Sequence, residues 1–121
     1  MSRVLLADDS GTMRTIIRRS LEALGVSEIV EASDGNQAVA QFQPGSFDLV
    51  LTDWNMPGKT GIEVIRAVRA VDRNTPIVMI TTEAEKSRVL EAIQAGVTDY
   101  LVKPFTTDKL KEKLDKFLCP A

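Results

Sequence analysis

Short apolar runs alternate with helical patterns along the whole chain of 121 residues. The runs 4–7, 49–52 and 77–81 are almost entirely apolar, which is typical of strands buried on both faces of a sheet. Two weaker runs, around 29–30 and at 100–102, indicate two further strands. The pattern therefore predicts an α/β fold, in which a five-stranded parallel sheet is flanked by five helices.

The segments between these runs have the apolar spacing of amphipathic helices. The expected helices span approximately 12–24, 36–42, 61–71, 83–95 and a last segment that ends at 118. Thr60 with Glu63, and Thr82 with Glu85, have the spacing of capping boxes that open two of them.

The lengths of the apolar runs predict the order of the strands. The first, third and fourth runs are the longest and should be central, which gives the order 2-1-3-4-5 of a flavodoxin-like, doubly wound sheet. Ligands of such sheets bind outside the carboxyl ends of the strands, where the winding reverses. That point lies between the first and third strands.

Charged residues directly follow three of the runs. Asp8 and Asp9 follow the first strand, Asp53 follows the third and Lys103 follows the last. Two carboxylates ~4 Å apart repel by about 4 kcal/mol at an effective dielectric near 20, so a cation must offset the cluster. We expect a hard divalent metal at this edge, with Lys103 as a second cation.

Composition excludes several functions. The length fits one domain, 1–121, and a formal net charge of -2 gives no basic surface for nucleic acid. The absence of histidine excludes Ser-His-Asp and Cys-His catalysis and a histidine phosphotransfer role. Cys119 has no intrachain partner and is interpreted as incidental. Without a long apolar segment or signal peptide, a cytoplasmic location is expected.

The segments 7–10, 53–57 and 103–105, together with Thr81, resemble the response-regulator receiver family, and within it the single-domain chemotaxis regulators. That family is a known example of this strand order, so the two expectations are not independent. The resemblance implies a single receiver domain without an effector domain. It also implies a phosphoacceptor switch that catalyses its own phosphorylation and dephosphorylation. Such a switch is not an enzyme with a separate substrate.

The resemblance assigns roles to the acidic residues. Asp53 would be the phosphoacceptor, because a carboxylate can attack phosphorus and form an aspartyl phosphate. Mg²⁺ would be held by Asp8, Asp9, Asp53 and the backbone carbonyl of Asn55. Lys103 would stabilise the phosphoryl oxygens during transfer.

Four further residues receive roles by resemblance. Thr81 would bind a phosphoryl oxygen and form a switch with Tyr100, which would turn inward when Thr81 moves. Asn55 and Glu83 would orient the water that hydrolyses the acyl phosphate. Trp54 is expected to be exposed near the metal.

The resemblance also implies a partner face on the last two helices and the final strand. Its expected residues are Lys86, Val89, Ile93, Tyr100 and Lys113. The phosphoryl donor would be a sensor histidine kinase of the CheA type, and the target a flagellar motor switch protein of the FliM type. A monomer that contacts neither nucleic acid nor membrane is expected. The alternative is a stand-alone receiver that relays phosphate or binds a non-flagellar target.

Two other classes of protein compete for the same pattern. A hydrolase of the haloacid dehalogenase type needs its second aspartate two residues after the first, where this chain has Ser10. A flavodoxin-like cofactor binder would use 10–12 as a phosphate cradle, but Asp8 and Asp9 would repel the flavin phosphate. An interaction module that has lost phosphorylation is disfavoured because every acid, lysine and hydroxyl position is filled.

Overall fold

A computed structural model describes residues 3–54, 56–81, 86–103 and 105–118 of the chain. Asn55, Glu83 and Cys119 lie outside these ranges, as does the expected capping pair of Thr82 and Glu85. Statements below about the presence or absence of contacts concern only the described residues.

Strands and helices alternate from one end to the other. In chain order they are β1 (Arg3–Ala7), α1 (Gly11–Ala23), β2 (Glu28–Ala32), α2 (Gly35–Gln41), β3 (Leu49–Thr52), α3 (Gly61–Val71), β4 (Ile77–Thr81), α4 (Lys86–Ala95), β5 (Asp99–Val102) and α5 (Thr107–Leu118). All four neighbouring pairs of strands are parallel, in the order β2-β1-β3-β4-β5. The predicted fold class and strand order are confirmed.

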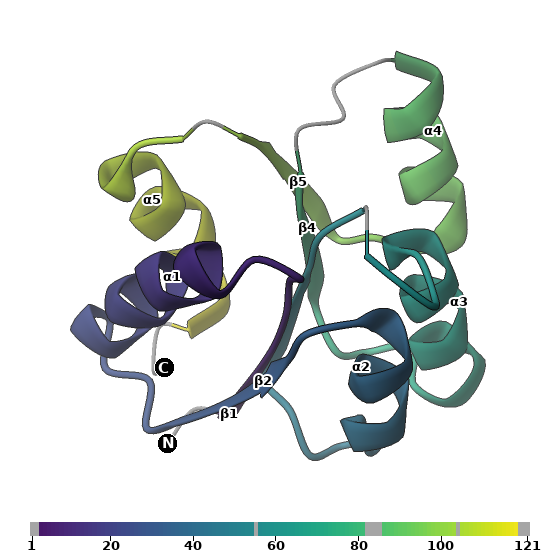
Figure 1. Ribbon diagram of the computed structural model, residues 1–121, viewed down its shortest axis with the longest axis horizontal. Helices are drawn as coiled ribbons and strands as arrows, with labels where there is room; N and C mark the ends of the chain where they lie inside the picture. Colours follow the sequence, from purple (N-terminus) through teal and green to yellow (C-terminus); the bar gives the residue numbers. More distant parts are fainter. Residues whose placement is uncertain (1–2, 55, 82–85, 104, 119–121) are drawn as a thin grey trace.

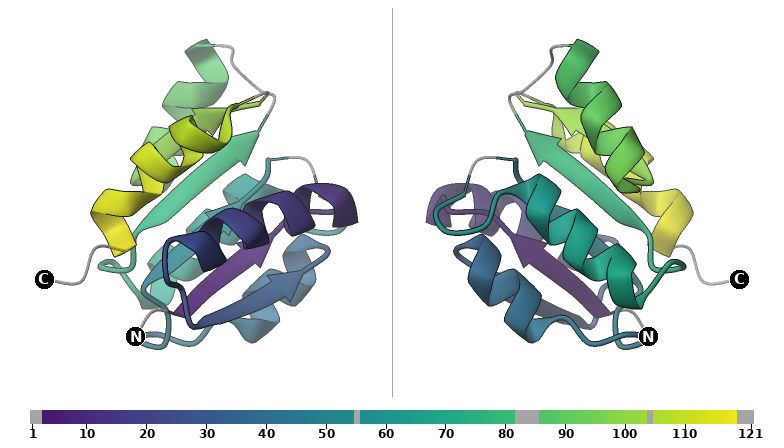
Figure 2. Two further views of the ribbon diagram at one scale, coloured as in Figure 1. Left: turned by 90° about the vertical axis from the view of Figure 1, so that its left-hand side faces the viewer. Right: turned by 90° about the vertical axis from the view of Figure 1, so that its right-hand side faces the viewer.

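The sheet is the middle one of three layers (Figure 1). Helices α1 and α5 cover one face, while α2, α3 and α4 cover the other, as the two side views in Figure 2 also show. The central strands β1, β3 and β4 are buried almost throughout, whereas β2 and β5 at the edges are partly exposed. The stronger apolar runs therefore lie in the middle of the sheet, as expected of a sheet covered on both faces.

Alternation along each strand divides the core into two clusters, one on each face of the sheet. On the face of α1 and α5, the largest fully buried side chains are Leu6, Ile17, Leu21, Leu49, Leu51, Ile80, Leu110 and Leu114. On the other face they include Leu5, Ile65, Ile77 and Met79. No described helix is long and apolar enough to cross a membrane.

Side-chain caps fix where three helices begin. The Ser10 and Asp34 side chains accept hydrogen bonds from the first turns of α1 and α2, respectively. Thr60 and Glu63 form the predicted reciprocal capping box at the start of α3. These caps matter for the site, because α1 and α3 begin directly beyond the carboxyl ends of β1 and β3.

Candidate functional site

Backbone hydrogen bonds hold three of the predicted site residues one position beyond their strands. The backbone N–H of Asp8 donates to Ala32 of β2 at 3.1 Å, and that of Asp53 donates to Ala7 of β1 at 3.0 Å. The N–H of Lys103 donates to Thr81 of β4 at 2.8 Å. The parallel ladder thus extends past the strand ends and aligns these residues at one edge of the sheet.

The side chains of these three residues meet at that edge. Lys103 Nζ lies 3.0 Å from Asp8 Oδ2 and 3.2 Å from Asp53 Oδ2. Asp8 and Asp53 are 1% and 9% exposed. Since a buried charge is costly unless it is paired and hydrogen-bonded, the contact with Lys103 offsets the burial of both carboxylates.

The environment of Lys103 stabilises its ammonium form. Burial on its own lowers the pKa of Lys103, but the hydrogen bond to Asp8 and the charges of Asp53 and Asp8 outweigh it. The net effect raises the pKa above its ordinary value of 10.5. The stabilisation from this contact is therefore fully present below that value and is lost as the pH rises through the higher folded-state pKa.

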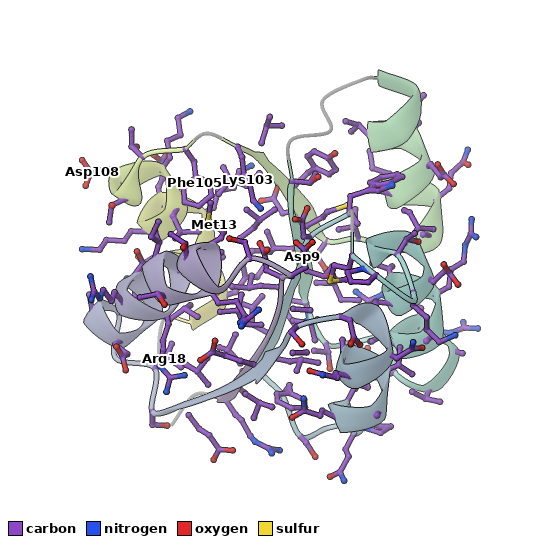
Figure 3. All side chains as sticks on the ribbon, in the orientation of Figure 1. Asp9, Met13, Arg18, Lys103, Phe105 and Asp108 are labelled. Carbon is purple, nitrogen blue, oxygen red and sulfur yellow. The ribbon has the colours of Figure 1, made fainter. Side chains whose placement is uncertain are left out.

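Asp9 completes an acidic pocket. One carboxylate oxygen from each of Asp8, Asp9 and Asp53 lies within 4.8 Å of the other two. Asp9 is exposed, and its side chain has no hydrogen bond or ion pair with the described residues. In Figure 3, Asp9 lies near the centre of the view, and Lys103 lies above it and to its left. Clustered carboxylate oxygens are the donors that Mg²⁺ prefers, so the pocket could hold that ion.

Trp54 is not exposed, contrary to the expectation from sequence. Its side chain is 4% exposed and packs in the cluster on the side of α2, α3 and α4. Strand alternation explains the difference, because Trp54 continues the face of Val50 while Asp53 faces the pocket. The Trp54 backbone N–H also donates to Asp53 Oδ1 at 2.6 Å, so the residue helps to orient the Asp53 carboxylate.

The start of α3 packs tightly against Asp53. A Cβ atom added at Gly61 would lie 2.1 Å from the Asp53 carbonyl oxygen, and the Gly61 N–H donates to the Trp54 carbonyl at 2.8 Å. Only glycine permits this approach of helix and strand end. Gly58 has a φ of 76°, which suits a turn in which a glycine follows Pro57.

The two expected switch residues lie on neighbouring strands, β4 and β5. Thr81 is the last residue of β4 and is fully buried. Tyr100 on β5 is half-buried and pairs in register with Met79. It packs against the core cluster on the side of α2, α3 and α4. Thr81 and Tyr100 therefore belong to the face of the sheet that α3 and α4 cover.

The expected partner-face residues differ in exposure. Ile93 is 56% exposed, whereas Val89, Tyr100 and Lys113 are half-buried. Lys113 pairs with Asp99 of β5, with Nζ 2.9 Å from Oδ1. Lys86 begins α4, and its side chain is outside the described part of the structure.

Sequence reasoning missed one residue of this face. Leu90 is 48% exposed, one turn from Ile93 on α4, while the smaller Ala92 and Ala95 face the core. A single exposed leucine is ordinary, but Leu90 and Ile93 together form an exposed apolar surface on α4. The alanine spacing in the sequence was the available signal.

Comparison with known proteins agrees with this geometry. Residues 4–115 match the response regulator receiver domain family. The chain is 49% identical over 116 residues to the chemotaxis protein CheY of Pseudomonas aeruginosa, which covers 94% of each chain. It is 47% identical over 116 residues to CheY-3 of Vibrio cholerae, covering 94% of this chain and 89% of that protein.

Solved structures show the same architecture. The chemotaxis response regulator CheY4 of Vibrio cholerae superposes with a TM-score of 0.88 at 38% identity, covering 97% of this chain and 98% of that one. A CheY-like receiver domain protein of Methanospirillum hungatei has a TM-score of 0.90 at 24% identity, over 98% and 94% of the two chains, which speaks for the fold alone.

The chain belongs to the response-regulator receiver domain family. Within that family it is homologous to the CheY chemotaxis regulators, which agrees with the resemblance inferred from its sequence motifs.

Proposed function

We propose that this protein is a phosphorylation-activated chemotaxis switch whose phosphoacceptor is Asp53. The observation that carries the proposal is the buried Asp53 carboxylate, which shares Lys103 with Asp8 inside a cluster of three acids. A structural aspartate gains nothing from two neighbouring like charges. In a site for phosphoryl transfer, by contrast, clustered carboxylates bind the cation that neutralises the anionic phosphoryl group.

The residues present divide the work of the reaction. A carboxylate oxygen of Asp53 forms a bond to phosphorus while the bond between phosphorus and the donor breaks. Lys103 is placed to neutralise charge on the transferred group, since its ammonium already lies 3.2 Å from Asp53. The Trp54 N–H orients the acceptor through its hydrogen bond to Oδ1.

Asp8, Asp9 and Asp53 are the described residues that would hold Mg²⁺, with the Asn55 carbonyl as the further expected ligand. When bound, the ion supplies positive charge that offsets the carboxylates and the phosphoryl oxygens. Asp8 already accepts hydrogen bonds from Ser10 and Lys103, which keeps its carboxylate aimed into the pocket.

Phosphorylation of Asp53 would change the surface formed by α4, β5 and α5, where a partner protein would bind. Thr81 ends the strand next to Lys103, and Tyr100 lies on the same face of the sheet. A new phosphoryl group that hydrogen-bonds Thr81 would change the packing beside Tyr100. Exposed Leu90 and Ile93 offer apolar surface on α4 for a partner protein.

Acetyl phosphate tests the phosphoacceptor directly. The full chain is incubated with acetyl phosphate and Mg²⁺, and its intact mass is measured by mass spectrometry. We expect the wild type to gain one phosphoryl group and Asp53→Asn to gain none, while EDTA suppresses the reaction. Exposed Asp115→Asn is the matched control and should label normally. Labelling of Asp53→Asn at the wild-type rate would place the acceptor elsewhere.

A second experiment separates chemotaxis from other outputs. We propose a CheA-like histidine kinase as the donor and a FliM-like motor switch protein as the target, which the similarity to chemotaxis CheY proteins supports. We expect an immobilised motor-switch segment to retain the phosphorylated chain, and Ile93→Asp to reduce retention without affecting labelling. Normal labelling without retention would favour the alternative, a receiver that relays phosphate or binds a non-flagellar target.

The lifetime of the phosphoryl group tests the roles of Asn55 and Glu83. If these residues orient the hydrolytic water, Asn55→Ala should slow the loss of the phosphoryl group after the donor is removed. An unchanged decay would show that another group performs this step.

A further inference from the structure

A chain of ion pairs joins α1 to the edge strand β2 beside the acidic pocket. Glu31 of β2 accepts a hydrogen bond from Arg14 Nε at 3.0 Å and also pairs with Arg18. Arg18 extends from α1 on the side of β2 in Figure 3, and pairs with Glu22 at 3.6 Å. The roles proposed above use none of these four residues.

Arg14 has a second contact that reaches the site itself. Its Nη1 donates to the backbone carbonyl of Asp8 at 2.6 Å. The Arg14 side chain is 20% exposed, and a charge-assisted hydrogen bond in such partly buried surroundings is stronger than one in water. One guanidinium therefore holds a carboxylate of β2 and a carbonyl after β1 together. The planar fork of arginine presents its N–H donors in a fixed geometry, which the ammonium group on the flexible lysine side chain does not.

The segment that Arg14 holds is short. Only Asp8, Asp9 and Ser10 separate β1 from α1. The Ser10 N–H donates to Asp8 Oδ1 at 2.9 Å, and the Ser10 side chain caps α1. The Asp9 side chain has no such restraint among the described residues. The direction in which Asp9 points therefore depends on the backbone of this turn.

We propose that Arg14, held by Glu31, is a positioning residue for the metal site. By fixing the Asp8 carbonyl, Arg14 sets the turn so that Asp9 stays within reach of the other two acids. Glu31 keeps the guanidinium on that carbonyl and away from the Asp9 carboxylate, where it would compete with the metal. This inference rests on the proposed function, because it concerns the same Mg²⁺ site.

Electrostatics alone predicts the opposite result. If Arg14 were only a nearby positive charge, removing it would reduce repulsion and strengthen Mg²⁺ binding. If Arg14 positions the turn, removing it weakens binding because Asp9 is no longer held in place. The direction of the change in Mg²⁺ affinity therefore distinguishes the two roles.

Calorimetric titration of Mg²⁺ into the metal-free full chain gives a readout that does not depend on phosphorylation. We expect Arg14→Ala to weaken Mg²⁺ affinity roughly tenfold, the lower end of the effect of residues that orient metal ligands. Arg14→Lys keeps the charge but loses the fork, and should also weaken binding. Arg19→Ala removes the same charge from an exposed position of α1, and should bind Mg²⁺ like the wild type.

Glu31→Gln tests the second half of the proposal. It should weaken Mg²⁺ binding, because Arg14 is then free to turn to Asp9. The double variant of Arg14→Ala and Glu31→Gln should bind no more weakly than Arg14→Ala alone, since both changes act through one contact. Additive losses would contradict the proposed chain of contacts.

Thermal unfolding in EDTA verifies that each variant is folded, and Arg14→Lys carries the test if Arg14→Ala does not fold. The inference is overturned if both Arg14 variants bind Mg²⁺ as tightly as the wild type, or more tightly. A wild-type chain that binds no Mg²⁺ overturns the metal site of the proposed function, and this inference with it. The two failures are therefore distinguishable.

Discussion

At the amino edge of the sheet, opposite the acidic pocket, Arg69 of α3 binds the loops that lead into β4 and β5. Its Nε donates to the carbonyl of Gly96 at 2.9 Å, and its Nη1 donates to that of Thr75 at 2.7 Å. Nη1 and Nη2 also reach the Asp72 carbonyl and the Thr98 hydroxyl, at 3.2 and 3.3 Å. The guanidinium is thus occupied by neutral acceptors.

The carboxylate of Asp72 at the same edge is equally occupied. It accepts hydrogen bonds from the Thr75 hydroxyl, from the N–H groups of Thr75 and Asn74, and from that of Gly45 in the loop before β3. These donors, the Thr75 hydroxyl foremost, hold the pKa of Asp72 well below its ordinary value of 3.8. Arg69 and Asp72 together tie three loops to the end of α3.

The carboxyl edge also has acidic and basic side chains, but its negative charges are not balanced by the described residues. Three carboxylates there face the single ammonium group of Lys103, and Asp9 has no partner among the described residues. The amino edge satisfies its charges internally and serves stability. The carboxyl edge retains negative charge that an external cation can offset, which is why we assign function to it.

Replacement of Lys103 should give the largest difference between the two edges. Lys103→Met removes the cation that faces the phosphoacceptor, so the labelling rate with acetyl phosphate should fall about a hundredfold, as for loss of one preorganised donor. The rate is followed by intact mass at saturating Mg²⁺. Exposed Lys109→Met on α5 is the control and should label normally. A Lys103→Met variant with the wild-type rate would remove the lysine from the mechanism.

Replacement of Arg69 should affect stability alone. Arg69→Met leaves the carbonyls of Gly96 and Thr75 without their charged donor, which should lower the free energy of unfolding by about 2 kcal/mol. Urea denaturation measures the loss, and exposed Arg66→Met on α3 serves as the control. Labelling of folded Arg69→Met should stay close to the wild-type rate. A large loss of labelling would show that the two edges are coupled.

Replacement of Asp9 should have opposite signs with and without metal. Asp9→Asn relieves repulsion and breaks no hydrogen bond in the described structure, so it should stabilise the metal-free protein by about 1 kcal/mol at low salt. In saturating Mg²⁺ the wild type gains stability by binding, and the order should reverse. Thermal unfolding in EDTA and in Mg²⁺ checks both signs. Destabilisation by Asp9→Asn in EDTA would mean that the pocket is not repulsive.

The smallest effect is expected from the titration of Asp72. Because its pKa is depressed in the folded state, Asp72 stabilises the fold above its ordinary value of 3.8, and this contribution is lost as the pH falls below that value. The wild type should therefore exceed Asp72→Asn in stability near neutral pH, and the gap should narrow in acid. Urea denaturation across this range measures the gap, with Asp115→Asn as the exposed control. A gap that does not depend on pH would contradict the assigned hydrogen bonds.

The sequence predicted the layers and the acidic edge because both depend on local patterns. Continuous apolar runs identified the central strands, and the position of a charge directly after such a run placed Asp8, Asp53 and Lys103 at one edge. The ends of the strands then determined where these site residues lie relative to one another. The roles of Asn55 and Glu83, which lie outside the described residues, stay predictions.

Contacts between side chains and distant backbone groups were not predictable in this way. Nothing in the spacing of Arg14 or Arg69 indicates which carbonyl each one meets, because the loops that present those carbonyls are placed by the packing of several elements. The burial of Trp54 and the exposure of Leu90, by contrast, follow from strand alternation and from the alanine spacing of α4, which are local patterns. The type and spacing of residues indicate which side of a helix or strand is buried. The packing of distant elements decides which groups a given side chain contacts.

The distances in sequence between the members of the acidic pocket have a consequence for the synthesis of the protein. Lys103 meets Asp8 and Asp53 across separations of 95 and 50 residues. A chain still emerging from the ribosome, or one cut by a protease before its last strand, lacks the lysine and cannot assemble the pocket. Only a finished and folded copy would then respond to a kinase, so truncated copies would stay silent in the signalling pathway.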